Sequence, residues 1–409
     1  MTAHTQLLPT AKRGLADKES SKAWLSYYAG YSQSFVSSSF AALGITDEDV
    51  ILDPWSGSGT TGLVAQTKGF QAISVEINPV IAYLAAGHFA LNSLPIKRIE
   101  KVIALLQNIV QRLQESDEDT VTGDFILDCI CTHLPSVRNT TRHRIAVQKT
   151  LLPDFSLAIS IVLLAYKRVA GYKLTKNPSW SVHDESTLRK DDFCKSLHLQ
   201  IAVVEASFTE PRARPTAKQI VGDARHLSLE SGSINAVITS PPYLTRIDYV
   251  KATSAETAWL FGIAQVRLSR ENNMGAPVIR TKTATTRWPA KSLVADVVAE
   301  VASHTSYAAQ NYYLKTIRQY FDDMFLSLSE LHRVLKPGGI ALLVVQNSYF
   351  KEVEIPLGEL YVDVWNRCFG SGEIVTRHLS NNSIVQINRR AVSSRMQKHL
   401  HEDTIALYK

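Results

Sequence analysis

The sequence predicts an α/β protein whose mostly parallel sheet is interrupted by a long, mainly helical insertion. Two separated regions, about 50–91 and 234–387, show apolar runs that alternate with helical stretches, which is the pattern of a parallel sheet. The region between them, about 93–219, lacks this alternation and has helical periodicity over parts of its length. At 45% hydrophobic and 20% charged residues, the 409-residue chain has an ordinary globular composition. Disordered, collagen-like and coiled-coil proteins are thereby excluded.

The first region begins with a strand–turn–helix–strand unit. Residues 50–53 form a short apolar run that ends in an acid, and a glycine-rich turn follows. Residues 60–66 have helical character, and 72–76 form a second strand. An Asn-Pro pair at 78–79 then opens a helix to about residue 91, with the proline well placed in its first turn. These elements make a βαβ unit of a parallel sheet.

The second region supplies the rest of the sheet. Helical periodicity over 311–335 is expected to stop at the Lys-Pro-Gly-Gly turn of 336–339, because this sequence does not continue a helix. The apolar run at 340–345 is typical of a buried central strand. The remaining elements are a strand at 234–239, a helix at 358–368 and a closing strand pair at 373–377 and 383–387.

The insertion divides the chain into three segments. These are the first part of the α/β domain at 21–92, an inserted, mainly helical subdomain at 93–219, and the second part of the α/β domain at 220–409. In the insertion, helices are expected at 96–113 and over much of 137–171, whereas 173–196 is polar with weak periodicity.

A second variable stretch, at 262–310, is expected to be a basic loop in which 281–288 is exposed. Its basic residues include Arg267, Arg270, Arg280, Lys282 and Arg287.

The sequence gives no sign of a membrane or secreted protein. Its longest apolar stretch, 155–166, is shorter than the roughly 20 residues of a spanning helix, and the first twenty residues lack a secretory apolar core. The four cysteines have no partner at zinc-ligand spacing, so we interpret them as buried structural thiols and expect no metal. A reducing, cytoplasmic setting follows. The cysteines are Cys129, Cys131, Cys194 and Cys368.

The net charge of +6 is unevenly distributed. Residues 1–130 carry a net charge of −5, whereas 131–220 carry +7 and 251–320 carry +5. Basic blocks are candidate surfaces for a polyanion such as nucleic acid, and binding through them would be salt-sensitive. An ordinary solvated surface is the alternative.

A glycine-rich turn directly follows the first strand. Residues 53–62 read Asp-Pro-Trp-Ser-Gly-Ser-Gly-Thr-Thr-Gly, in which Gly57 and Gly59 allow a tight turn and close approach of a ligand. The helix that follows presents its N-terminal N–H groups to that ligand. Glu76, at the end of the next strand, can accept both hydroxyls of a ribose. A plain strand-to-helix turn and a dinucleotide site remain open, but the ATP-binding G-K-[S/T] signature is absent.

The strand at 234–239 leads into a Ser-Pro-Pro-Tyr sequence at 240–243. Two consecutive prolines stiffen the chain and remove two N–H donors. A carbonyl acceptor, the Ser240 hydroxyl and the Tyr243 ring then form a fixed array, which suits an exocyclic amine on a planar base. A proline-rich loop with a core tyrosine is the alternative.

Together these two motifs resemble the amino-group DNA methyltransferases, which use S-adenosylmethionine. The 53–61 sequence is similar to the family's D-P-F-x-G-x-G-T-T cofactor motif, with Trp55 in place of phenylalanine, and 239–243 is similar to its catalytic S-P-P-Y motif. Gly222-Asp223-Ala224 resembles the loop whose acid reads the cofactor's adenine, and 28–35 resembles the element that closes over the methionine end. The resemblance covers about 25–91, 220–260 and 311–390.

The resemblance implies a Rossmann-like sheet of seven mostly parallel strands and one site at the carboxyl ends of its strands. The implied catalytic residues are Ser240, Pro241, Pro242 and Tyr243. The implied cofactor-binding residues are Tyr31, Asp53, Pro54, Trp55, Gly57, Gly59, Thr60, Thr61, Glu76, Ile77, Asp223 and Ala224. The target base would be flipped out of the duplex beside Tyr243.

Ser240 favours cytosine N4 as the methylated atom, since family members with Asp or Asn at this position most often act on adenine N6. No Pro-Cys pair exists, which argues against methylation of a cytosine ring carbon. Adenine-N6 DNA methylation, RNA base methylation and a DNA-binding protein with a relic site are the alternatives.

The expected cofactor is S-adenosylmethionine, with S-adenosylhomocysteine as product. The expected partners are duplex DNA and a cognate restriction endonuclease that acts on the same site. The cofactor motif precedes S-P-P-Y here, whereas many S-P-P-Y enzymes have the opposite order. We expect the 93–219 insertion to recognise the target sequence, with 262–310 as the alternative.

Overall fold

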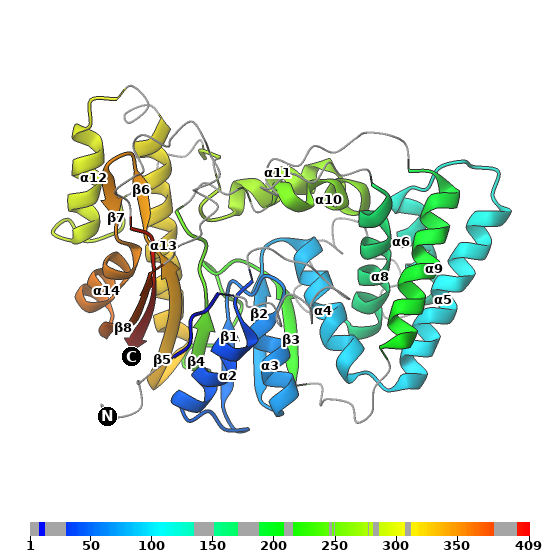
Figure 1. The fold of residues 1–409 in the computed structure, drawn as a ribbon, viewed down its shortest axis with the longest axis horizontal. Coiled ribbons are helices and arrows are strands. Elements are labelled where there is room, and N and C mark those ends of the chain that lie inside the picture. The colour runs from blue at the N-terminus through cyan, green and yellow to red at the C-terminus, as the bar shows by residue number, and fades with distance from the viewer. Residues whose placement is uncertain are drawn as a thin grey trace.

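The fold was examined in a computed structural model of the chain (Figure 1). The structure describes residues 8–12, 30–134, 151–170, 188–207, 216–244, 248, 250–276, 278–280, 286–306, 312–379 and 399–409.

A seven-stranded sheet forms the centre of the molecule, and its strand order is β3-β2-β1-β4-β5-β9-β8. Its neighbouring strands pair in parallel except where β9 pairs antiparallel with β5 and with β8. The predicted Rossmann-like, mostly parallel sheet is therefore confirmed. Its strands are β1 (Val50–Asp53), β2 (Gln71–Glu76), β3 (Ala217–Val221), β4 (Ile234–Thr239), β5 (Leu335–Gln346), β8 (Ser371–Leu379) and β9 (His401–Tyr408).

Both faces of the sheet are covered, which explains why its central strands are continuously apolar. Ile51 and Leu52 are neighbours in β1 but belong to opposite cores. Ile51 packs with helices α2 (Gln33–Ala42) and α3 (Thr60–Lys68). Leu52 packs on the side of α12 (Leu293–Ser303), α13 (Leu314–Val334) and α14 (Leu357–Cys368).

Several predicted elements match the structure closely. The strands predicted at 50–53 and 234–239 are β1 and β4, with the same bounds. The strand predicted at 72–76 is β2, which begins one residue earlier, and the helix predicted at 60–66 is α3, which is two residues longer. The helix predicted at 358–368 is α14, which begins at Leu357.

The predicted Lys-Pro-Gly-Gly turn lies inside a strand. Helix α13 ends at Val334, but β5 begins immediately at Leu335, which pairs with Ile234. The next pairing joins Ala236 to Ile340, so the intervening residues bulge out of the ladder. Gly338 has a φ of 78° within this bulge, a conformation that glycine adopts without strain. The helix ends before this motif, as expected. The motif itself forms a bulge in β5 and not a turn between the helix and the strand.

One strand of the predicted closing pair is found among the described residues. β8 corresponds to the strand predicted at 373–377, and within the described chain it pairs with β9. The other predicted strand, 383–387, lies outside the described residues. A short second sheet pairs β6 (Ser348–Phe350) with β7 (Val353–Ile355).

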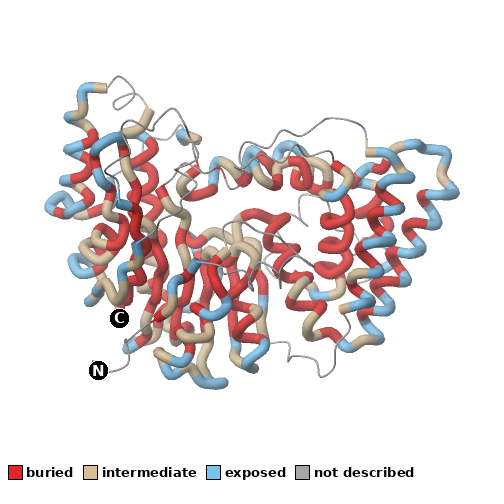
Figure 2. The backbone as a smooth tube through the Cα atoms, viewed as in Figure 1, coloured by how far each residue is buried: buried red, intermediate tan, exposed pale blue. Residues whose placement is uncertain are grey.

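A helical lobe adjoins the sheet on the right of Figure 1. Its helices share a core separate from the two that cover the sheet, and α8, which holds the long apolar stretch of the sequence, is buried along most of its length (Figure 2). The segment 251–261 also packs into this lobe, so the lobe extends beyond the predicted insertion. The helices are α4 (Pro79–Ser93), α5 (Ile96–Glu115), α6 (Gly123–His133), α8 (Pro153–Val169), α9 (Lys190–Ala206) and α10 (Ser254–Phe261).

The stretch predicted as a variable basic loop is partly helical. It contains α11 (Ile263–Asn272) and α12, and Val294, Val298 and Val301 of α12 face the core. Trp288, predicted to be exposed, is only 6% exposed and packs edge-on against Phe321.

The cysteine prediction holds only in part, because Cys368 is exposed and Cys131 is partly exposed, whereas Cys129 and Cys194 are buried. None of the helices in the described ranges is long and apolar enough to cross a membrane.

Candidate active site

The site lies where β1 and β4 adjoin at the centre of the sheet. The chain adds β2 and β3 on one side of β1, then returns to place β4 on the other side. Open α/β sheets bind ligands at the carboxyl ends of their strands at such a switch in strand order. The predicted cofactor turn follows β1 and the S-P-P-Y loop follows β4, so the fold brings the two motifs together.

Asp53, the last residue of β1, is the buried junction of the site. Its Oδ2 accepts a hydrogen bond of 2.7 Å from the Tyr31 hydroxyl, and its Oδ1 accepts one of 2.6 Å from the Thr239 hydroxyl. The Tyr31 hydroxyl also contacts the Thr61 hydroxyl. Asp53 is 1% exposed, and burial raises the pKa of its carboxyl despite these hydrogen bonds. The predicted cofactor residues Tyr31, Asp53 and Thr61 are thus in one network, which also contains Thr239.

The glycine-rich turn adopts the conformation for which its glycines are suited. Gly57 and Gly59 have φ angles of 50° and 81°, and the Gly59 N–H donates to the Ser56 carbonyl at 2.8 Å. Gly59 is the N-cap of α3, so Thr60 and Thr61 form the start of this helix. Pro54 is buried. Trp55 is partly exposed, and its backbone N–H donates to Asp53 Oδ1. The turn places backbone N–H groups beside the end of β1.

Glu76, at the end of β2, holds the glycine-rich turn. Its Oε2 accepts from the Gly57 N–H at 3.0 Å and its Oε1 from the Asn78 N–H at 2.9 Å. Asn78 in turn caps α4, and Ile77 is partly exposed between them. Burial raises the pKa of the Glu76 carboxyl to about 7, although both hydrogen bonds favour its charged form.

Asp223 follows β3 and lies next to Glu76 in the fold. The Gly222 N–H donates to the Glu76 carbonyl at 3.0 Å, which fixes the loop against β2, and Ala224 is buried. The Asp223 carboxylate accepts from the Arg225 side chain at both oxygens, at 2.6–3.0 Å. Sequence reasoning missed Arg225, although it stands two residues after Asp223.

The S-P-P-Y loop is held by three contacts. Ser240 Oγ donates to the Val344 carbonyl at 3.0 Å and lies 3.2 Å from the Tyr243 hydroxyl. Tyr320 of α13 donates to the Pro242 carbonyl at 2.9 Å. Ser348 donates to the Leu244 carbonyl at 2.5 Å. Pro241 is buried, whereas Ser240 and Tyr243 are partly exposed at the strand end.

The supporting residues of this loop, Tyr320 and Ser348, carry no sequence signal. They lie 78 and 104 residues from their partners, and only the fold brings them close. Among the described residues, no group of three or more His, Cys, Asp or Glu side chains is arranged to hold a metal ion.

The order and direction of the sheet strands are consistent with a Rossmann-like methyltransferase fold. A family model for N6/N4 DNA methylases matches residues 41–87, which contain β1, the glycine-rich turn, Glu76 and the start of α4. The Type II methyltransferase M.BsoBI of Geobacillus stearothermophilus is 22% identical over 385 residues, an alignment that covers 82% of this chain and 75% of that protein. Both similarities support the amino-group (N6/N4) DNA methyltransferases as the family that this chain resembles.

Proposed function

We propose that the protein transfers a methyl group from S-adenosylmethionine to the N4 amine of a flipped-out cytosine in duplex DNA. The observation that carries this proposal is the Asp53–Thr239 hydrogen bond, which joins the cofactor turn to the S-P-P-Y loop in one site. Similarity to the amino-group DNA methyltransferases supports a DNA methyltransferase that uses S-adenosylmethionine.

The residues at the strand ends fit the cofactor. Glu76 and Asp223 are carboxylates at the ends of adjacent strands, which suits hydrogen bonds from ribose hydroxyls and from an adenine amine. The turn at 54–60 suits the methionine end, because glycine lets a ligand approach the backbone. Asp53 is almost fully buried, so we propose that it acts by holding Tyr31 and Thr239 in place.

The S-P-P-Y loop suits a planar base with an exocyclic amine. When bound, S-adenosylmethionine supplies an electrophilic methyl group. The amine of a nucleobase is a poor nucleophile because its lone pair is delocalised into the ring. We propose that Ser240 Oγ and the Pro241 carbonyl accept hydrogen bonds from this amine, which localises the lone pair on nitrogen. Tyr243 stacks on the base, and the loop acts mainly by positioning.

The Ser240 environment supports cytosine N4. Its hydroxyl donates to the Val344 carbonyl, which leaves the Ser240 lone pairs available to an incoming amine. An acid at this position would place a charged acceptor against the carbonyl acceptor of Val344. The geometry thus disfavours the aspartate that adenine-N6 enzymes often have at this position.

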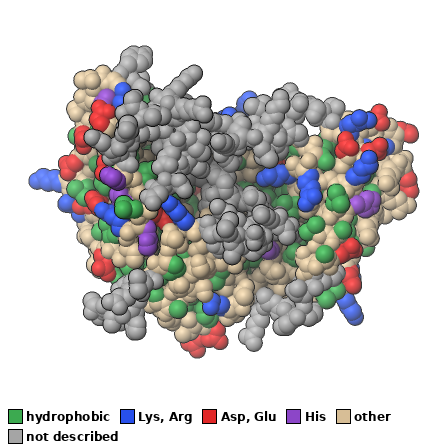
Figure 3. Space-filling view, in the orientation of Figure 1, with side chains coloured by type: hydrophobic (Ala, Val, Ile, Leu, Met, Phe, Trp, Pro, Cys, Tyr) green, Lys and Arg blue, Asp and Glu red, His purple; other side chains and the backbone are tan. Residues whose placement is uncertain are grey.

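We propose that the helical lobe recognises the target sequence. The segment after the S-P-P-Y loop runs directly into it: Thr253 accepts from the Asn78 side chain, and Trp259 of α10 donates to the Val121 carbonyl. Lys and Arg side chains are visible on the lobe at the right of Figure 3. Six of the fourteen basic residues of 131–220 are described: Lys167, Arg168, Arg189, Lys190, Lys195 and Lys218.

The proposed base is tested by incubating the protein with labelled S-adenosylmethionine and unmodified duplex DNA, followed by mass spectrometry of the digested nucleosides. We expect N4-methylcytosine. Formation of N6-methyladenine would agree with the proposed cofactor site but would show that Ser240 does not select the base. Methylation of RNA alone would overturn the assignment of DNA as substrate.

A further inference from the structure

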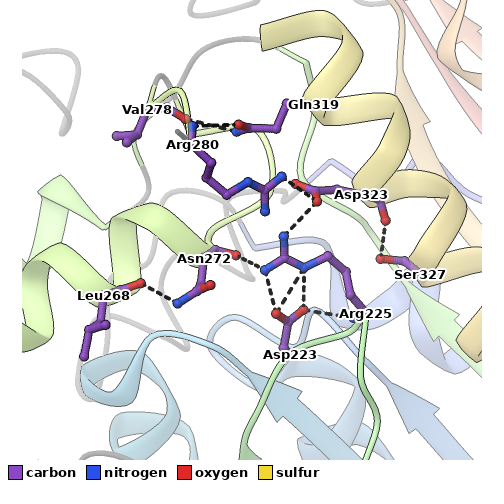
Figure 4. Close-up of polar contacts among 9 residues, drawn as sticks. All are labelled: Asp223, Arg225, Leu268, Asn272, Val278, Arg280, Gln319, Asp323 and Ser327. Atoms are coloured by element: carbon purple, nitrogen blue, oxygen red, sulfur yellow. Dashed lines mark hydrogen bonds and ion pairs between the residues drawn. The ribbon is translucent and has the colours of Figure 1, made fainter. Parts of the chain in front are cut away.

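A partly buried ion-pair cluster joins the proposed cofactor site to α13 and to the segment that follows α11 (Figure 4). At its centre is Arg225, whose side chain is 7% exposed. It contacts Asp223 through Nε and Nη2, and Asp323 of α13 through Nη1 at 2.7 Å. Asp323 Oδ1 also accepts from Arg280 at 2.7 Å. The negative charges of Asp223 and Asp323 therefore balance the positive charges of Arg225 and Arg280.

The planar guanidinium of Arg225 donates hydrogen bonds in several directions. Besides the two carboxylates, its Nη2 donates to the Asn272 carbonyl at 2.8 Å, at the end of α11. A lysine ammonium is a compact point charge and does not reproduce this fork. Burial disfavours the charge of Arg225, but its hydrogen bonds to Asp223 and the negative charge of Asp323 raise its pKa above the usual value. The position therefore requires the forked geometry of an arginine side chain and not only a positive charge.

Two routes lead from Arg225 to the loop proposed to receive the base. The first passes through Asn272 to Gly275, where an added Cβ would lie 3.2 Å from the Tyr243 carbonyl oxygen and 3.7 Å from Pro242 Cβ. Gly275 has a φ of 75°, so this close approach and the backbone conformation both favour glycine.

The second route runs along α13. Asp323 is one helical turn from Tyr320, whose hydroxyl holds the Pro242 carbonyl. Gln319, the residue before Tyr320, binds the backbone of the 278–280 segment: it accepts from the Arg280 N–H at 2.9 Å and donates to the Val278 carbonyl at 3.0 Å. Arg225 is therefore connected by two routes to Pro242 and Tyr243 of the S-P-P-Y loop.

We propose that Arg225 is a positioning residue for methyl transfer, which orients Asp223 toward the cofactor's adenine and links cofactor binding to the position of the S-P-P-Y loop. This inference rests on the proposed function, in which Asp223 binds the adenine. Arg225 touches neither the reacting atoms nor the base, and it acts through Asp223, Asn272 and Asp323.

Arg333→Lys is the matched control for Arg225→Lys. Arg333 also joins the β3–β4 connection to α13 by a forked set of contacts, with the Leu227 and Leu229 carbonyls and with Glu330. It lies near the C-terminal end of α13, beside the start of β5 and away from the S-P-P-Y loop. Both substitutions keep the positive charge, and each removes a guanidinium group that joins the β3–β4 connection to α13.

The experiment measures binding of S-adenosylhomocysteine by calorimetry, binding of duplex DNA with and without S-adenosylhomocysteine, and kcat. We expect S-adenosylhomocysteine to strengthen DNA binding by the wild type. Arg225→Lys should weaken S-adenosylhomocysteine binding about tenfold or more, lower kcat, and bring the ratio of the two DNA affinities close to one. Arg333→Lys should retain wild-type values.

A double-mutant cycle tests whether Arg225 acts through Asp223. Asp223→Asn and Arg225→Lys should each weaken S-adenosylhomocysteine binding, and the double variant should be no weaker than the worse single variant. Asp223 is 25% exposed, so Asp223→Asn provides a variant that is less disruptive to folding if Arg225→Lys unfolds. Additive effects would overturn the proposal.

The failure of the positioning role differs from failure of the function. An active wild type whose Arg225→Lys and Arg333→Lys variants bind and react equally well would overturn only the role of Arg225. A wild type that neither binds S-adenosylhomocysteine nor methylates DNA or RNA would overturn the proposed function, and the positioning role with it.

Discussion

The Thr239 hydroxyl donates a 2.6 Å hydrogen bond to Asp53 Oδ1, and both residues are almost fully buried. Asp53 ends β1 and Thr239 ends β4, so this one contact spans the point where the strand order reverses. It fixes the glycine-rich turn relative to Ser240, the residue after Thr239. The glycine-rich turn and the S-P-P-Y loop are thereby parts of one rigid site.

Removing this hydroxyl should destabilise the fold. In Thr239→Val, Asp53 keeps its burial but loses a donor, so we expect the free energy of unfolding to fall by about 1–3 kcal/mol, measured by urea denaturation. Thr67→Val is the control, because Thr67 is exposed and donates only within α3. Thr239→Ser should retain most of the stability, and equal stability of the Val and Ser variants would contradict this role.

Glu76 should make stability depend on pH. Its pKa is about 7 in the folded protein and near 4.5 when unfolded, so between these values the unfolded chain binds fewer protons. The free energy of unfolding should therefore fall as pH rises from about 4.5 to about 7, by an amount on the order of 1–3 kcal/mol, and then level off. Glu76→Gln should lack this fall in urea titrations at pH 5 and pH 8. An identical pH profile for the two proteins would exclude the raised pKa.

Gly62 should be intolerant of a side chain. A Cβ at this position would lie 2.4 Å from Phe89 Cζ and 2.9 Å from Ser74 Oγ, in the contact between α3 and α4. We expect Gly62→Ala to lower the free energy of unfolding by about 1–3 kcal/mol through overpacking. Phe89→Leu should recover part of that loss in a double-mutant cycle. No recovery would show that the steric contact with Phe89 is not the cause.

The strands at the centre of the sheet were predictable because their signal is local. β1 and β4 are apolar runs buried on both faces, and each ends at a polar residue of the site. β9 was missed because it begins with His401, Glu402 and Asp403, which read as a polar segment. All three are buried, and Asp403 is paired with Arg377 of β8. The partner that makes this strand possible is remote in sequence.

The 262–310 stretch was mispredicted for a different reason. Its positive charge favoured an exposed loop, although Val294, Val297, Val298 and Val301 have the spacing of one helix face. The helical signal was present but was outweighed by the charge pattern.

The site residues were predicted mainly from the two motifs. The structure brings Asp53, Glu76, Asp223 and Ser240 to the same edge of the sheet. Their roles stay predictions. The residues that support them, such as Arg225 and Tyr320, depend on contacts between distant segments and could not be found from spacing.

The most direct test of a single active site is transfer of the methyl group from prebound S-adenosylmethionine to duplex DNA in a single turnover, for the wild type and Tyr243→Ala. We predict that wild type methylates the DNA. We also predict that Tyr243→Ala binds S-adenosylmethionine normally but transfers the group about five- to hundredfold more slowly, because it loses base stacking. Transfer at the wild-type rate by a folded Tyr243→Ala, or a wild type that binds the cofactor but methylates no nucleic acid, would contradict the proposed site.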